Sequence, residues 1–317
     1  MKRCLSLLLL CALTLLLFGC VTSPTAIKVN GVSVDAAEVA FYLRYNQSAG
    51  SLEAVKAAAL DQISTAELIR QKCKEMKLSL TKEQKATLKQ EKEALINQLG
   101  GKAAYLEYLN ASLLTDRGYD KFQENALYYQ LLYNAVHEKN KDIYTGEYLG
   151  QFFTGNYLAI RYIAVSRLDN DGNPLSEAAD AAQKVKAEQA LNEMLANNAD
   201  LDAILEKYNE DPEMMGGSEP LVLSRNEAEQ EYPFLLPAFE LEPGDFDGIY
   251  TTDTGYYIFI RSALSANYYS EHAEEIYYNA VDSTFSAQIK DWKKQSRITT
   301  TRVFDQMTLE NLADYLK

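Results

Sequence analysis

The most informative part of the chain is Pro233-Phe234-Leu235-Leu236-Pro237-Ala238-Phe239-Glu240-Leu241-Glu242-Pro243-Gly244-Asp245, followed by Gly255-Tyr256-Tyr257-Ile258-Phe259-Ile260. The first stretch predicts a helical turn over 234–240. The second stretch is rich in aromatic and β-branched residues and predicts a strand over 256–261. Shorter strands are expected at 221–223 and 248–250.

The residues that precede this part extend the pattern to the order β-α-α-β-α-β-β. They predict a strand over 157–165, a turn over 169–174, and helices over 176–196 and 201–208. Asp169 and Asp171 in the turn suggest calcium, but the glycine and the distal glutamate of an EF-hand do not follow at the right spacing. We therefore expect a solvated turn.

Together with Tyr208-Asn209-Glu210-Asp211-Pro212 and Gly216-Gly217, these segments resemble the parvulin family of peptidyl-prolyl isomerases. The resemblance implies a parvulin-like domain over 155–264, built on a small mixed four-stranded sheet with helices. It also implies an activity that rotates the bond before proline, without a cofactor or a metal ion. The partners of such an activity are unfolded or newly exported polypeptides that contain Xaa-Pro bonds.

The resemblance also assigns roles to individual residues. The expected catalytic positions are Asp211, Tyr162, Tyr257 and Thr252. The expected substrate-binding positions are Phe234, Phe239, Leu223 and Thr254. Taken alone, Phe234 and Phe239 could instead be core anchors of the module's third helix, and Asp211 could be a turn residue before Pro212.

The chemistry of the reaction needs few reactive groups. The bond before proline has a rotation barrier of about 18 to 20 kcal/mol, and no covalent bond breaks during rotation. A catalyst has only to bind the twisted amide better than either planar form, which an apolar pocket with a few polar groups can do.

Two positions depart from the family pattern. Tyr162 and Tyr257 stand where the family usually places histidine. A phenol is larger than an imidazole and donates only one proton. Two adjacent tyrosines could nevertheless rebuild a hydroxyl network with Asp211 and Thr252, so retained and lost isomerase activity both remain open.

The N-terminus predicts export. Lys2 and Arg3 precede an apolar run from Leu5 to Phe18 that is short for a membrane helix and ends at Gly19-Cys20. Leu17-Phe18-Gly19-Cys20 resembles a bacterial lipobox, which implies that residues 1–19 are a signal peptide and that Cys20 carries lipid. The expected location is the extracytoplasmic face of a bacterial cell membrane, with ordinary signal cleavage as the alternative.

Charge and cysteine content limit the partners and the source of stability. The formal net charge is −14, and removal of Lys2 and Arg3 with the signal makes it −16. Such a charge repels phosphate backbones, so nucleic acid is not an expected partner. Cys73 would remain as the single unlipidated cysteine, which leaves no internal disulfide and favours a buried, unreactive thiol.

The rest of the chain predicts a mainly helical domain. Residues 27–34 alternate around Asn30-Gly31 and predict a hairpin, and Asp35 with Glu38 marks a helix start. Further helices are expected over 52–77, 81–98, 102–113 and 116–139, then a linker over 142–155, and C-terminal helices over 270–294 and 308–317. The expected class is α+β.

This layout resembles foldase lipoproteins of the PrsA and SurA type. In those proteins a parvulin domain is inserted into a helical chaperone-like domain, here residues 20–150, and C-terminal helices, here 265–317, pack back on it. Tyr119, Phe122, Ala126, Tyr129, Tyr133 and Val136 form an aromatic stripe at helical spacing. The stripe is expected to be core, with a groove for clients as the alternative.

Two functions from different classes follow. The first is a lipid-anchored foldase that binds unfolded secreted chains and isomerises their prolyl bonds, with a homodimer as a further prediction. The alternative is a holdase whose parvulin domain binds peptides without catalysis. A solute-binding lipoprotein would explain the export signal but not the Phe-Glu-Leu-Glu-Pro-Gly motif.

Overall fold

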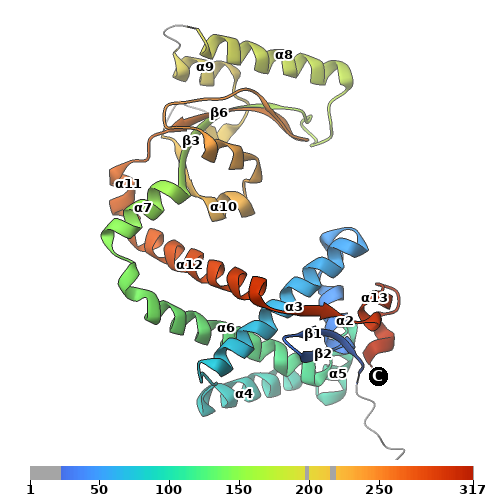
Figure 1. The fold of residues 1–317 in the computed structure, drawn as a ribbon. Coiled ribbons are helices and arrows are strands. Elements are labelled where there is room, and N and C mark those ends of the chain that lie inside the picture. Colours follow the sequence, from blue (N-terminus) through green and yellow to red (C-terminus); the bar gives the residue numbers. More distant parts are fainter. Residues whose placement is uncertain (1–22, 197–199, 215–218, 317) are drawn as a thin grey trace, which may run out of the picture. The chain divides into compact units, whose positions relative to one another are not determined.

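The computed structural model describes residues 23–196, 200–214 and 219–316. The expected signal peptide, Cys20, Gly216 and Gly217 lie outside the described residues. The chain has an α+β fold that divides into two compact units (Figure 1). Unit 1 comprises the residues up to Lys141 together with Asp282–Lys317, and unit 2 comprises Asp142–Val281.

An antiparallel three-stranded sheet opens unit 1, in the order β2-β1-β7. Its strands are β1 (Thr25–Val29), β2 (Val32–Asp35) and β7 (Ile298–Thr300). Asn30 and Gly31 have φ angles of 51° and 85°, as the two central residues of a tight hairpin turn require. The predicted hairpin is confirmed, whereas β7 lies where the sequence predicts no strand.

The remainder of unit 1 is mainly helical, as predicted, but the helix expected over 308–317 is only the short 3-10 helix η5 (Leu312–Leu316). It contains α2 (Ala36–Tyr45), η1 (Gln47–Ala49), α3 (Leu52–Glu75), α4 (Lys82–Gln98), α5 (Lys102–Ala111), α6 (Asp116–Asn140), α13 (Arg302–Gln306) and η5 (Leu312–Leu316). Asp35 accepts from the Glu38 N–H at 2.9 Å, and Thr81 and Gln84 form both halves of a capping box. These local contacts explain why the predicted helix starts agree with the structure.

The aromatic stripe on α6 is divided between core and surface. Val136 is buried in a cluster with Phe285, and the rings of Tyr129 and Tyr133 each lie edge-on to Phe285 at 5.2 Å between centroids. Tyr129 is nevertheless 44% exposed and Phe122 is 42% exposed. The expectation of a wholly buried stripe is therefore only partly met.

Cys73 lies in the same cluster as Phe285 and is fully buried. Burial raises the pKa of its thiol, which disfavours the reactive thiolate form. The prediction of a buried thiol is confirmed.

Unit 2 is built on a four-stranded sheet in the order β4-β3-β6-β5. Its strands are β3 (Tyr157–Ser166), β4 (Leu221–Ser224), β5 (Tyr250–Thr251) and β6 (Gly255–Ser262). All three pairings are antiparallel, so the expectation of a mixed sheet is wrong. The central strand β3 runs against both of its neighbours, and the tight turn at 252–254 reverses the chain between β5 and β6.

Helices cover both faces of this sheet. Side chains of β3 alternate, so that Ile163 packs with α8 (Glu177–Met194) and α9 (Leu201–Tyr208). Tyr162 packs instead with α10 (Arg225–Gln230) and η4 (Pro233–Glu240). Because both faces are covered, β3 is apolar on both sides and almost wholly buried.

Unit 2 extends beyond the expected 155–264 at both ends. The expected linker contains η2 (Lys141–Ile143) and a helix, α7 (Gly146–Asn156), whose cap Thr145 accepts from the Tyr148 N–H. After β6 come α11 (Ala266–Glu271) and α12 (Ala273–Gln295).

A third apolar cluster of unit 2 joins these added elements. Phe153 of α7, Tyr157 of β3 and Ile276 of α12 pack together. The boundary between the units, after Val281, therefore falls inside helix α12 and not before it. Among the described residues, no helix combines the length and apolar character needed to cross a membrane.

Candidate active site

Tyr162 and Asp211, both expected at the site, are joined by a hydrogen bond. The Tyr162 ring lies in β3 and is 1% exposed, and its hydroxyl donates to Oδ2 of Asp211 at 2.7 Å. A phenol that donates to a carboxylate makes one of the stronger kinds of neutral-to-charged hydrogen bond. The structure thus brings together one tyrosine and the acid with which it was expected to form a network.

The segment 208–212 reaches Tyr162 because it docks along β3. The Asn209 side chain accepts from the Ala164 N–H at 2.7 Å and donates to the Asp211 carbonyl at 2.8 Å. The Glu210 N–H donates to the Ala164 carbonyl at 2.8 Å. Asp211 also begins the 3-10 turn η3 (Pro212–Met214), since its carbonyl accepts from the Met214 N–H. Its backbone therefore makes a turn while its side chain faces Tyr162.

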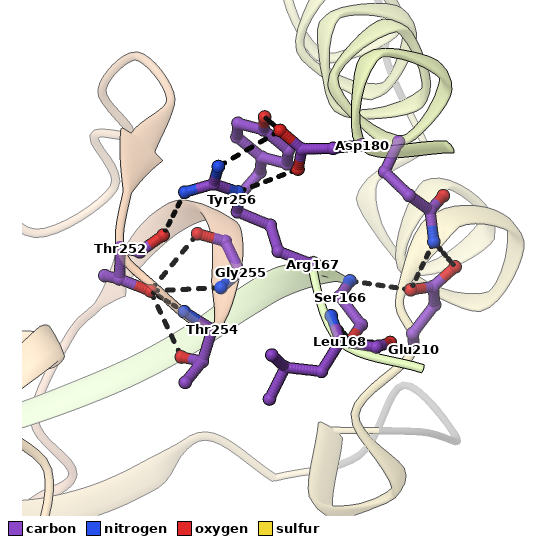
Figure 2. Close-up of polar contacts among 10 residues, drawn as sticks. Ser166, Arg167, Leu168, Asp180, Glu210, Thr252, Thr254, Gly255 and Tyr256 are labelled. Atoms are coloured by element: carbon purple, nitrogen blue, oxygen red, sulfur yellow. Dashed lines mark hydrogen bonds and ion pairs between the residues drawn. The ribbon is translucent and has the colours of Figure 1, made fainter. Parts of the chain in front are cut away.

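Glu210 anchors the same segment to the end of β3. Its carboxylate accepts from the Ser166 N–H at 2.7 Å (Figure 2) and from Lys186 Nζ at 2.7 Å. Burial opposes ionisation of this group, but the bonds from Lys186 and Ser166 outweigh it and lower the pKa of Glu210.

Tyr257, the second tyrosine expected at the site, stands at the end of a chain of hydroxyl groups. Thr252 Oγ1 lies 3.1 Å from Thr254 Oγ1, which lies 3.3 Å from the Tyr257 hydroxyl. Thr252 Oγ1 also accepts from the N–H groups of Thr254 and Gly255 at 3.1 and 3.0 Å, which closes the turn between β5 and β6 (Figure 2). We call Thr252, Thr254 and the Tyr257 hydroxyl the hydroxyl chain.

The absence of a side chain at Gly255 leaves room for the Tyr257 ring. A Cβ atom at Gly255 would lie 3.0 Å from two ring carbons of Tyr257 and 3.2 Å from its hydroxyl oxygen. Only glycine leaves this approach free of crowding.

Phe234 brings the two tyrosines into one aromatic cluster. Its ring centroid lies 4.6 Å from that of Tyr257 and 5.8 Å from that of Tyr162. Tyr232 adds a fourth ring, 6.4 Å from Phe234. Tyr232, Phe234 and Tyr257 are partly exposed, so in this aromatic cluster of Tyr162, Tyr232, Phe234 and Tyr257 these three rings offer one apolar wall to a ligand, and the buried Tyr162 ring lies behind them.

Phe239 and Leu223 lie in the core behind this wall. They are 8% and 1% exposed, and the Arg225 guanidinium covers the Phe239 ring at 4.3 Å from its centroid. Both side chains were expected to touch substrate. Their burial places them instead in the support of η4 and β4.

The site suits binding and polarisation better than bond cleavage. It combines an aromatic wall, the three hydroxyl groups of the hydroxyl chain and one carboxylate, and none of its residues named here is a nucleophile held by a base. Within the described residues, no group of three or more histidine, cysteine, aspartate or glutamate side chains could hold a metal ion. His272 stacks on the Tyr268 ring at 3.8 Å between centroids, which is a structural contact.

Solved structures similar to this chain are foldases of the PrsA and SurA type. Foldase protein PrsA from Streptococcus pneumoniae is 15% identical, with a TM-score of 0.32 over 89% of this chain and 97% of that one. A SurA-like chaperone from Campylobacter jejuni is 11% identical, with a TM-score of 0.35 over 88% and 100%. Peptidylprolyl isomerase PrsA from Bacillus anthracis is 15% identical, with a TM-score of 0.36 over 74% and 95%.

No family model matches the chain, and no curated protein does. At these identities the likeness to PrsA- and SurA-type foldases concerns fold alone. The function is therefore argued from the site.

Several residues beside the site are given no site role by the sequence, although Asn209, Glu210 and Tyr256 stand in the motifs that carry the resemblance. Arg167, Asp180 and Tyr256 form a linked group next to the turn of the hydroxyl chain (Figure 2), and Asn209 and Glu210 fix the Asp211 segment. Their partners come from other elements, so spacing along the chain does not reveal them. The one local signal is an arginine that directly follows an apolar strand.

Proposed function

We propose that this chain is an extracytoplasmic foldase that accelerates cis–trans isomerisation of prolyl bonds in unfolded polypeptides. The observation that carries the proposal is the aromatic cluster of Phe234, Tyr257 and Tyr162 beside the Asp211 carboxylate. A wall of aromatic rings suits the pyrrolidine ring of proline, and the polar groups beside it suit the amide that must rotate.

In the proposed mechanism the protein favours the twisted amide. Rotation removes the resonance of the peptide bond and leaves the proline nitrogen able to accept a hydrogen bond. Phe234 and Tyr257 hold the ring, while the tyrosine and threonine hydroxyls supply donors at the edge of the wall. Groups that are already fixed before the substrate binds lower the barrier without further reorganisation.

The soluble protein that begins at Val21 should accelerate isomerisation of short Xaa-Pro peptides. Phe234→Ala should lose most of this acceleration and keep its fold, because Phe234 is only partly buried. Phe122→Ala is a matched control, since it removes a partly exposed phenylalanine of unit 1. An equal loss of rate in both variants would contradict the assignment of the site.

Exposed aromatic side chains of unit 1 favour the second candidate, a holdase. Tyr45, Tyr108 and Tyr129 are 64%, 52% and 44% exposed, and such rings suit contacts with unfolded segments. The holdase should suppress aggregation of an unfolded client without accelerating isomerisation. Acceleration well above background would exclude a purely non-catalytic holdase.

We further propose that lipid at Cys20 anchors the protein to the outer face of the membrane. The support is the order of the N-terminal segments: two basic residues, then an apolar run, then Gly19-Cys20. Mass spectrometry of the N-terminal peptide of the wild-type protein should show the added acyl mass, and Cys20→Ser should abolish it. A wild-type N-terminal peptide without acyl mass would contradict the anchor.

A further inference from the structure

Arg167 links helix α8 to the turn of the hydroxyl chain. It directly follows β3, and its guanidinium lies between the Asp180 carboxylate and the Thr252 carbonyl (Figure 2). Nε and Nη2 donate to the two Asp180 oxygens at 2.8 and 3.0 Å, and Nη1 donates to the Thr252 carbonyl at 2.7 Å. Such a planar, three-way contact suits arginine and cannot be copied by lysine.

Further contacts hold the same parts together. The Arg167 N–H donates to the Thr254 carbonyl at 2.9 Å, so backbone and side chain of one residue hold both threonines of the turn. The guanidinium lies 5.2 Å from the centroid of the Tyr256 ring, and the Tyr256 hydroxyl donates to Asp180 at 3.1 Å. The Arg167 hydrogen bonds lower the pKa of Asp180, which keeps this pair ionised.

The turn that Arg167 holds is the turn that carries the hydroxyl chain. Thr252 bonds Thr254, and Thr254 bonds Tyr257, so a shift of the Thr252 backbone moves the partners of the Tyr257 hydroxyl. We infer that Arg167, held by Asp180, is a positioning residue of the prolyl site that sets where the hydroxyl chain lies. The inference rests on the proposed function for its effect on rate.

Arg161, which lies within β3, provides a matched control. It is an arginine of β3 that pairs with Asp202 of α9, just as Arg167 pairs with Asp180 of α8. Within the described residues, the hydrogen bond and ion pair of Arg161 go to Asp202, and not to the turn at 252–255. Loss of either pair removes one ion pair between the sheet and a helix, but only the loss of Arg167 should disturb the site.

The experiment compares Arg167→Met, Asp180→Asn and Arg161→Met in the soluble protein that begins at Val21. Arg167→Met should lower kcat about tenfold and leave KM within about twofold, because misplacement by a fraction of an ångström costs rate more than binding. Asp180→Asn should lower kcat less, and the double variant should be no worse than Arg167→Met, since both changes break one link. Arg161→Met should keep the wild-type kcat.

A second measurement detects positioning without any assay of rate. The Cζ resonance of Tyr257 in tyrosine-labelled protein, assigned by its loss in Tyr257→Phe, should move in Arg167→Met and stay in Arg161→Met. An unmoved resonance in Arg167→Met, or an equal fall of kcat in Arg161→Met, would overturn the inference. If wild-type protein accelerates no peptide while the resonance still moves, the proposed function fails and the positioning link stands.

Discussion

At the scale of single residues, the candidate site depends on a hydrogen bond from a buried phenol to a carboxylate. The Tyr162 ring is closed off from solvent, and its hydroxyl is directed at Asp211 at 2.7 Å. Removal of the hydroxyl therefore leaves a partly buried carboxylate with one hydrogen bond fewer, which costs more than the loss of an exposed contact.

Tyr162→Phe should keep the fold and lose rate. We expect the unfolding free energy to fall by about 1 kcal/mol, as for a typical buried hydrogen bond, and kcat/KM for an Ala-Pro peptide to fall about tenfold. Urea unfolding and the peptide assay measure these two quantities. A full rate in a Tyr162→Phe protein would remove Tyr162 from the set of catalytic residues.

Gly255→Ala tests the close approach of the Tyr257 ring. The new methyl group would lie 3.0 Å from two ring carbons, so the ring has to move by a few tenths of an ångström. We expect a loss of isomerase rate with little loss of stability, measured by the peptide assay and thermal unfolding. Gly248→Ala is the control, because a Cβ at Gly248 meets no atom within 4 Å, and equal losses in both variants would contradict this explanation.

At the scale of elements, a charged group lies among three helices of unit 1. Glu38 of α2 pairs with Lys121 of α6 at 2.7 Å, and Glu67 of α3 lies 3.8 Å from the same lysine. Burial raises the pKa of Glu38, against the opposing effect of Lys121. The folded state thus holds this proton more tightly than the unfolded state does, so ionised Glu38 lowers stability.

Glu38→Gln should consequently change how stability depends on pH. The unfolding free energy of the wild-type protein should fall as the pH rises from the unfolded pKa of Glu38 through its raised folded pKa, because the unfolded state ionises this group more readily. The glutamine variant should not show this fall. Its stability relative to wild type should therefore be higher near pH 7 than near pH 4, as measured by urea unfolding.

Lys121→Met is the contrasting variant. It should destabilise the protein near pH 7, because it leaves two mostly buried carboxylates without their shared cation. If Glu38→Gln and Lys121→Met lose stability equally at that pH, the assigned cost of burying Glu38 is wrong.

Elements with local signals could be predicted from the sequence, and elements fixed by distant partners could not. The Asn30-Gly31 hairpin and the Thr81–Gln84 capping box depend on neighbouring residues. By contrast, β7 exists because Ile298–Thr300 pairs with β1, which lies at the other end of the chain, and the direction of β3 against its neighbours is a property of the assembled sheet.

The same distinction applies to the candidate site. Phe234, Asp211 and the two tyrosines stand at positions of a recognisable motif, and the structure brings them together. Phe239 shares that motif yet is buried, because the side of η4 that faces the sheet is set by packing. Arg167 belongs to no motif, and only the fold shows that it contacts Asp180 and Thr252.

At the scale of the whole molecule, charge is divided unevenly between the units. Residues 142–281 contain 26 acidic and 7 basic residues, a formal charge of −19, whereas the remaining residues contain 19 acidic and 24 basic residues, a charge of +5. Four of the seven basic side chains of unit 2 form ion pairs with carboxylates of the same unit, which leaves its net charge at −19: Arg161, Arg167, Lys186 and Lys207. The unit with the candidate site is therefore strongly negative.

This charge should make the proposed isomerase prefer cationic segments. A field of one sign attracts oppositely charged ligands and speeds their encounter by about tenfold or more at low salt. We expect kcat/KM to be about tenfold higher for a Lys-Pro-Lys peptide than for a Glu-Pro-Glu peptide at low ionic strength, with an Ala-Pro-Ala peptide between them. The peptide assay at a series of salt concentrations measures this difference.

The dependence on salt concentration distinguishes the long-range effect of the charge of unit 2 from a direct contact at the site. At 0.1 M salt, charges act over about 10 Å, and at 1 M over about 3 Å, so a preference that arises from many distant carboxylates should nearly vanish at high salt. A preference that persists there would indicate a direct ion pair at the site. If the three peptides are accelerated equally at low salt, the negative charge of unit 2 does not select the substrate.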